Sequence, residues 1–263
     1  MDPLVAILLG VLQGLTEFFP VSSSGHLALF GHWFGLAEPD LTFDVLVHLA
    51  TLLAILVYFR ADWIQLFRLL FRRGRGDLPR LLIPYLLLSM IPAGLVGFLL
   101  EDQVEWFHAR PGWVGVFLIV NGLLLLWGMR HQGGGKSFED LSFGTVIGIA
   151  LAQATAILPG ISRSGSTIVT GQLLGLDRRA AARFSFLMVV PVIGGAGLLK
   201  LLDLFANKDA LSTDLLFAYG AGFVAATLSG FFALAFLMRL LEGPRFFQFG
   251  FYCLALGLFA LAL

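Results

Sequence analysis

Charged residues are scarce in this sequence of 263 residues: Asp, Glu, Lys and Arg make up 13%, against roughly 25% in a soluble domain. Hydrophobic residues make up 58%. This composition excludes an ordinary soluble domain and predicts an all-α polytopic membrane protein with about six spanning helices. Each expected span approaches or exceeds the ~17–25 residues needed to cross a bilayer. The spans are expected at about 43–60, 81–100, 113–130, 184–204, 215–239 and 246–263.

Other features are also missing. Cys253 is the only cysteine, which excludes an intramolecular disulfide and a cysteine metal cluster. The first residues, MDPLVAILLG, lack the basic region and small-residue cleavage site of a signal peptide, so we expect no cleavage there. The formal net charge is +0, which argues against a nucleic-acid partner.

The few basic residues are unevenly distributed, which predicts the topology. The segment 60–80 carries six arginines, whereas 101–110 carries three acidic residues and one arginine. The positive-inside rule therefore places 60–80 in the cytoplasm and 101–110 outside, together with the lysine-poor segment 204–214. Further basic residues assigned to the cytoplasm are Arg130, Lys136, Arg178, Arg179, Arg183, Arg239 and Arg245.

With six spans, two further apolar segments must return to the side from which they start. They lie at about 3–36 and 142–176, and Pro, Gly and Ser interrupt both. We interpret them as re-entrant helical hairpins, one entering from outside and one from inside. Their sequences, QGLTEFFPVSSSGHL and QATAILPGISRSGST, align Ser22 with Ser162 and Gly25 with Gly165. This predicts one membrane domain, 1–263, built as an inverted repeat of 1–130 and 141–263, with the broken helices meeting near the midplane.

The first hairpin carries a carboxylate and a histidine. A charged Glu17 at mid-membrane depth costs about 2.5–3.5 kcal/mol, so such residues usually mark a site. Gln13 lies four residues earlier on the same helix face, and the pair could bind Mg²⁺ or Ca²⁺; Glu17 could also act as a general base. His26 could transfer a proton or attack phosphorus. The alternatives are a solvated surface Glu17 and a structural His26.

The second hairpin carries an arginine that needs an anion. The guanidinium of Arg163 suits phosphate, with hydroxyls at Ser162, Ser164, Ser166 and Thr167 and backbone amides near Gly160 and Gly165. Small residues also allow close helix packing, but packing leaves Arg163 unexplained. A lipid-linked phosphate or diphosphate would use the polar groups of both hairpins.

The stretches QGLTEFFPVSSSGH and PGISRSGST resemble the two signature motifs of the bacterial undecaprenyl-diphosphate phosphatase family, which is linked to bacitracin resistance. The resemblance covers nearly the whole chain. It implies hydrolysis of a C55 isoprenyl diphosphate to the monophosphate carrier for cell-wall synthesis, dependence on a divalent cation, and location in the bacterial cytoplasmic (inner) membrane. It also implies the inverted-repeat fold.

Carried over to this chain, the motifs imply catalytic roles for Glu17, Ser23, His26 and Arg163, with Ser23, His26 or water as the nucleophile. Glu17 and Gln13 would bind the metal; Gln13 stands where some members have Glu, which lowers the available negative charge. The residues expected to bind substrate phosphate are Ser22, Ser24, Gly25, Ser162, Arg163, Ser164, Gly165 and Thr167. The site is expected to open to the outer, periplasmic side.

Expected partners are the isoprenyl diphosphate substrate and membrane lipids, and homodimer formation stays open. A lipid-phosphate transporter or flippase with an inverted-repeat fold is the main alternative, and a membrane scaffold the other. Four further polar or aromatic residues could line the entrance, although interfacial packing accounts for them more simply. They are His32, Trp33, Asp44 and His48.

Overall fold

A computed structural model describes residues 1–34, 41–70, 81–128, 133–206, 213–241, 243, 246 and 248–262. These residues form α-helices and one short 3-10 helix, with no strand among them. Of the basic residues assigned to the cytoplasm, the arginines between 72 and 80, Arg130 and Arg245 lie outside the described residues.

Helices of the first half run through residue 128. They are α1 (Pro3–Phe18), α2 (Ser23–Trp33), α3 (Leu41–Tyr58), α4 (Arg60–Leu70), α5 (Leu82–Leu99), α6 (Glu101–His108) and α7 (Pro111–Gly128). The second half contains η1 (Phe138–Asp140), α8 (Phe143–Thr155), α9 (Arg163–Leu173), α10 (Arg178–Ala206), α11 (Thr213–Leu240) and α12 (Phe249–Ala262).

The membrane spans only partly match the expected set. Four helices, α5, α7, α10 and α11, contain stretches long and apolar enough to cross a membrane. Helices α3 and α4 pass the same test together but bend by 76° at their junction. The expected last span is represented by α12, which has 14 residues and begins at Phe249. The chain is therefore a multi-pass membrane protein, and the part that the structure describes contains four candidate spans, or five if the bent pair counts as one.

Two charged segments expected between spans, 60–80 and 101–110, contain helices. Residues 60–70 form α4 because their arginines are spaced among apolar residues, as in an amphipathic helix. Asp62 lies in the first turn, where its negative charge interacts favourably with the helix dipole. Asp62 also forms an ion pair with Arg183 of α10. Residues 101–108 form α6, which begins with two acidic residues, Glu101 and Asp102. Their charged residues place both segments outside the spans, and charge does not prevent an amphipathic surface helix.

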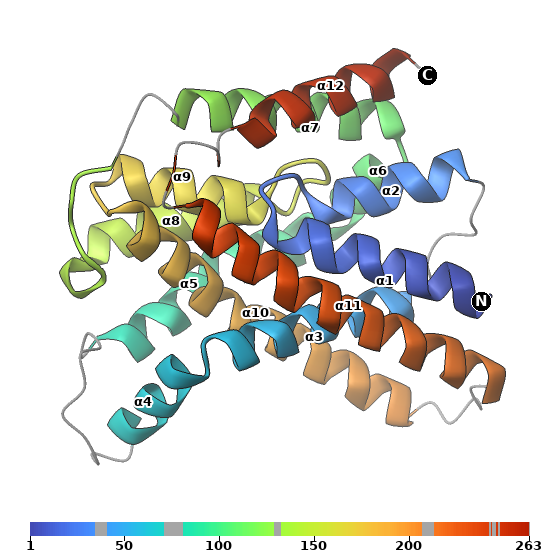
Figure 1. The fold of residues 1–263 in the computed structure, drawn as a ribbon, viewed down its shortest axis with the longest axis horizontal. Coiled ribbons are helices and arrows are strands. Elements are labelled where there is room, and N and C mark those ends of the chain that lie inside the picture. Colours follow the sequence, from blue (N-terminus) through green and yellow to red (C-terminus); the bar gives the residue numbers. More distant parts are fainter. Residues whose placement is uncertain are drawn as a thin grey trace.

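Each predicted hairpin is a pair of helices separated by a short break. The break between α1 and α2 contains Pro20, and α2 then runs back beside α1 (Figure 1). The break between α8 and α9 contains Pro159 and Gly160, and Gly160 has φ +110°. Proline lacks the N–H that would continue the helix, so both helices end here.

The two hairpins are held by long helices from both halves of the chain. Helix α1 packs along α11 and α8 packs on α5, while α12 and α7 lie side by side at one edge (Figure 1). In the core, Phe18 of α1 meets Phe186 of α10 edge to face, with ring centroids 5.8 Å apart. This packing fixes the breaks of both hairpins inside the molecule.

Candidate active site

The breaks of the two hairpins contact each other. The hydroxyl of Ser22 accepts hydrogen bonds from the backbone N–H of Gly160 at 3.0 Å and of Gly25 at 3.3 Å. A Cβ atom on Gly25 would lie 3.0 Å from the Gly160 Cα, so a side chain at Gly25 would force the breaks apart. Ser22 itself has φ 69°, a strained value for a residue other than glycine. The close contact between the two breaks explains why Ser22 and Gly25 are both small residues.

The helices that follow the breaks begin in the same way. Ser22 caps α2 and accepts from Gly25 N–H, and Ser162 caps α9 and accepts from Gly165 N–H at 3.1 Å. The next aligned serines repeat the match: the Ser22 and Ser24 hydroxyls lie 3.3 Å apart, and those of Ser162 and Ser164 lie 3.1 Å apart. The alignment predicted from sequence therefore corresponds to equivalent local structures.

Glu17 lies at the centre of a polar cluster. Its Oε1 accepts from Nη2 of Arg163 at 2.6 Å, and its Oε2 accepts from the Ser23 hydroxyl at 2.7 Å. The Gln13 amide also donates to Oε2, at 3.0 Å. The Glu17 side chain is 7% exposed and that of Arg163 is 14% exposed. The ion pair therefore joins the two hairpins in a largely enclosed site.

The first residues of α2 and α9 supply two of the three donors to Glu17. Ser23 is the first residue of α2 and Arg163 is the first residue of α9, so the same position in each matched helix points at one carboxylate. Arg163 also donates to the Ser185 carbonyl of α10 at 3.5 Å. The positive ends of both helix dipoles lie beside the cluster, which favours an anion there.

The remaining predicted residues are placed differently. The ring nitrogens of His26 bond to the Ser22 carbonyl and the Tyr252 hydroxyl, each at 2.7 Å, rather than to Glu17 or Arg163. The Thr167 hydroxyl bonds to the Ser185 hydroxyl at 2.6 Å and so ties α9 to α10. The Gly25 and Gly165 amides are occupied by their capping serines. In this conformation the cluster itself consists of Gln13, Glu17, Ser23 and Arg163.

A match to a protein-family model identifies the family to which these two motifs belong. The model for bacitracin resistance protein BacA covers residues 6–259. The chain belongs to the BacA family. The resemblance on which the site residues were assigned is thereby confirmed.

Three relatives of this BacA-family chain are named undecaprenyl-diphosphatase. An undecaprenyl-diphosphatase from Pelotomaculum thermopropionicum is 42% identical over 98% of this chain and 95% of its own length. One from Desulforudis audaxviator is 43% identical over 98% of this chain and 96% of its own. A third, from Rubrobacter xylanophilus, is 42% identical over 100% of this chain and 98% of its own.

Two contacts of this site, through Asn121 and Tyr252, were missed from the sequence, and a third involves His48, which was named only as a possible entrance residue. Asn121 of α7 donates to the Pro20 carbonyl at 2.9 Å and accepts from the Ser162 N–H at 3.0 Å, so it bridges both breaks. Tyr252 of α12 bonds His26. His48 of α3 places Nε2 3.8 Å from Glu17 Oε2. Asn121 left a signal that was not used, because a lone amide in an apolar span usually has a specific partner.

Asn121→Ala is expected to lower stability by about 1–3 kcal/mol for each buried group left without its partner. The groups are the Ser162 N–H and the Pro20 carbonyl, which would keep only the weak thiol donor of Cys253 at 3.6 Å. Thermal unfolding in detergent measures the effect, with Val120→Ala as the control because Val120 is 46% exposed on the same helix. Equal stability of the two variants would contradict the bridging role.

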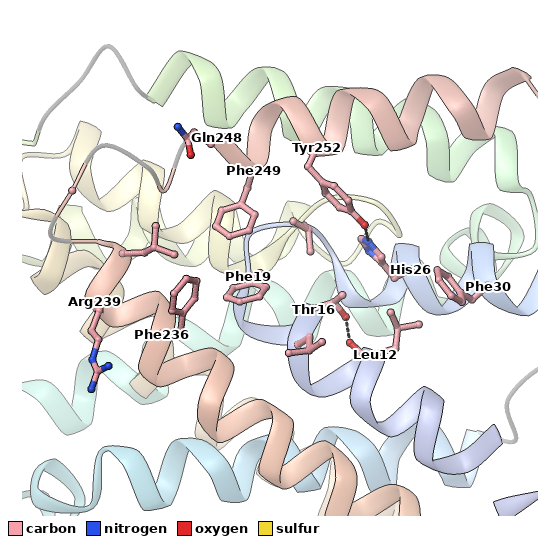
Figure 2. A pocket seen from close by; sticks show the side chains of 14 residues that line it. Leu12, Thr16, Phe19, His26, Phe30, Phe236, Arg239, Gln248, Phe249 and Tyr252 are labelled. Atoms are coloured by element: carbon pink, nitrogen blue, oxygen red, sulfur yellow. Dashed lines mark hydrogen bonds between the residues drawn. The ribbon is translucent and has the colours of Figure 1, made fainter. Parts of the chain in front are cut away.

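An apolar cavity of about 990 Å³ lies beside the first hairpin, between α1, α11 and α12. Phe19, Phe236 and Phe249 line it (Figure 2). His26 and Tyr252 lie at one side of the cavity and Arg239 at the other, as Figure 2 shows. The cavity therefore combines an apolar wall with one of the predicted catalytic side chains.

Proposed function

We propose that this protein is an integral membrane phosphatase that hydrolyses undecaprenyl diphosphate to undecaprenyl phosphate and inorganic phosphate. The observation that carries the proposal is the Arg163–Glu17–Ser23 cluster, which brings both family motifs into one site. Relatives named undecaprenyl-diphosphatase match over nearly their whole lengths. The reaction recycles the lipid carrier for cell-wall synthesis.

Arg163 binds the diphosphate in this proposal. Its guanidinium has five N–H donors, and the contacts to Glu17 and the Ser185 carbonyl engage only part of them. The charge on the terminal phosphoryl group spreads over its oxygens during transfer, and a fixed guanidinium in an enclosed site stabilises that charge. Seven further residues shape the site around the phosphates: Ser22, Ser24, Gly25, Ser162, Ser164, Gly165 and Thr167. Their N–H and O–H groups bond to neighbouring side chains, and a change in these bonds would free the groups to donate to phosphate oxygens.

Ser23 is the proposed nucleophile, because its hydroxyl already donates to a carboxylate. In the first step the Ser23 oxygen attacks the terminal phosphorus, its proton passes to Glu17, and the bond to the bridging oxygen breaks to release undecaprenyl phosphate. In the second step water attacks the phosphoserine and gives a proton to His26, the bond between phosphorus and the Ser23 oxygen breaks, and Glu17 returns its proton to that oxygen. His26 then releases its proton to bulk water. Inorganic phosphate is the second product.

A divalent cation, Mg²⁺ or Ca²⁺, fits this site only together with the substrate. Among the described residues there is no group of three His, Cys, Asp or Glu side chains that could hold a metal. The buried Gln13 Oε1 has no hydrogen-bond partner, however, and lies on the residue that bonds Glu17. Glu17 and Gln13 would hold the ion with phosphate oxygens completing its ligands. Bound there, it would neutralise phosphate charge as a Lewis acid.

The isoprenyl chain is proposed to occupy the cavity of about 990 Å³. The walls offer the aromatic and aliphatic contacts that a hydrocarbon chain requires, and His26 lies where the chain would meet the phosphates. Each buried CH₂ group contributes about 0.8 kcal/mol, so a long chain supplies much of the binding free energy.

Filling the cavity should weaken binding of long substrates only. Leu240→Trp, which narrows the cavity next to Arg239 and away from His26, is expected to raise KM for the C55 diphosphate on the order of 10-fold, equivalent to losing contacts of about two CH₂ groups. KM for farnesyl diphosphate should stay unchanged. Leu228→Trp is the matched control, because Leu228 is 57% exposed on the same helix, α11. An equal rise for both substrates would contradict the placement of the chain.

The topology belongs to the same proposal. Two re-entrant hairpins and an inverted repeat are supported by the matched serine caps and by the pairing of α1 with α11 and α8 with α5. Six spans require that the bent pair α3–α4 and the 14-residue α12 also cross the membrane. Opening to the periplasm rests on the distribution of arginine, and location in the inner membrane rests on membership of the BacA family. Homodimer formation stays a prediction.

The test is phosphate release from C55 diphosphate by detergent-purified protein, with and without EDTA. Release that EDTA abolishes and Mg²⁺ or Ca²⁺ restores is the expected result. Release insensitive to EDTA would remove the cation from the proposal but leave the hydrolase. No release by folded wild-type protein would overturn the enzyme and favour a lipid-phosphate transporter.

A further inference from the structure

Tyr252 contacts His26 from the far end of the chain. The two residues are separated by 226 positions, and Tyr252 lies on α12, outside both motifs. We propose that Tyr252 is a positioning residue whose hydroxyl bonds Nε2 and holds the His26 ring for proton transfer. The kinetic part of this inference rests on the proposed phosphatase activity, whereas the contact itself does not.

The partners of His26 determine its tautomer. Nδ1 lies 2.7 Å from the Ser22 carbonyl oxygen, which can only accept, so Nδ1 carries the proton. In the neutral ring Nε2 is then the acceptor, and the Tyr252 hydroxyl at 2.7 Å donates to it. Nε2 is therefore the nitrogen available to take up a proton.

The surroundings of His26 fix the orientation of its ring and require a hydrogen-bond partner for Nε2. The two rings are nearly parallel, at 8°, with centroids 5.7 Å apart, which fixes the plane of the imidazole. His26 is 2% exposed, and its neighbours along the cavity wall are mostly apolar. An unpaired Nε2 would be costly in such surroundings.

A tyrosine hydroxyl can serve both protonation states of its partner. It donates to Nε2 while His26 is neutral. The hydroxyl hydrogen then rotates away so that the Nε2 lone pair can take the proton of the attacking water, and afterwards the hydroxyl oxygen accepts from Nε2–H. No other bond of the ring has to change, because Nδ1 continues to donate to Ser22. Tyr252 thus keeps Nε2 hydrogen-bonded before and after proton transfer.

Tyr252→Phe keeps the aromatic ring and removes only the hydroxyl. We expect kcat for C55 diphosphate to fall on the order of 10-fold with little change in KM, because a buried acceptor loses its donor. Tyr85→Phe on α5 is the matched control and should leave kcat unchanged. An unchanged kcat for Tyr252→Phe in active protein would overturn the proposal.

A double-mutant cycle separates positioning from a general structural effect. If Tyr252 acts through His26, adding Tyr252→Phe to His26→Ala should cost nothing further. A further loss of 10-fold in that background would overturn the assignment, since it would show an effect independent of the imidazole.

Nitrogen NMR tests the contact without relying on catalysis. With ¹⁵N-labelled histidine, wild-type His26 should show a protonated Nδ1 and an unprotonated, hydrogen-bonded Nε2, identified by their loss in His26→Ala. Tyr252→Phe should shift the Nε2 resonance towards that of an unbonded nitrogen and leave Nδ1 in place. An Nε2 resonance that ignores the substitution would overturn the contact, whereas absent phosphate release with the shift present would overturn only the phosphatase activity.

Discussion

Arg163→Ala is expected to lower kcat/KM for phosphate release from C55 diphosphate by about 10³-fold. The substitution removes the guanidinium that would hold the transferred phosphoryl group. It also removes the cation 2.6 Å from Glu17, whose side chain is only 7% exposed. Steady-state phosphate release by purified protein measures the effect.

Two further variants keep this result interpretable. Arg163→Lys retains the charge but loses the planar fork, so its activity should lie between wild type and Arg163→Ala. Arg110→Ala removes an exposed arginine that lies 3.8 Å from the centre of the Trp106 ring, and it should leave activity unchanged. Full activity in folded Arg163→Ala protein would show that the arginine does not bind the phosphates.

Glu17→Gln and Ser23→Ala are each expected to lower kcat by about 10²–10⁴-fold, because proton transfer between the two side chains is lost. The pair should behave as a unit, so the double variant should lose little beyond the worse single variant. The hydrogen bond of 2.7 Å between them is the basis for this non-additivity.

A covalent intermediate gives the sharper measurement. Brief reaction with substrate labelled in the terminal phosphate should leave label on wild-type protein at Ser23 and none on Ser23→Ala. Glu105→Gln, an exposed carboxylate on α6, is the control for removing a carboxylate and should label normally. Label missing from Ser23 in active wild-type protein would favour direct attack by water.

The helical class and the meeting of the two motifs could be predicted from the sequence. Scarce charge and long apolar runs require helices in a membrane, and Glu17 and Arg163 stood out because an isolated charge there needs a partner. The alignment of the two hairpins then predicted matching helix starts, which Ser22 and Ser162 confirm.

The contacts of α7 and α12 could not be predicted in the same way. Asn121 and Tyr252 are single polar residues on apolar helices, and their partners in the first hairpin lie 101 and 226 residues away. No local spacing records such pairs. The extent of α4 was missed for a different reason, since a basic segment can be a loop or an amphipathic helix.

The Glu17–Arg163 pair sets an order for biosynthesis. The two residues are separated by 146 positions, so Glu17 is made long before the cation that neutralises it. During synthesis the first hairpin therefore carries a carboxylate that disfavours full burial in lipid. Stable insertion of that hairpin would wait for the second one. A truncated chain ending before residue 163 would keep its first hairpin at the membrane surface, exposed to quality-control proteases.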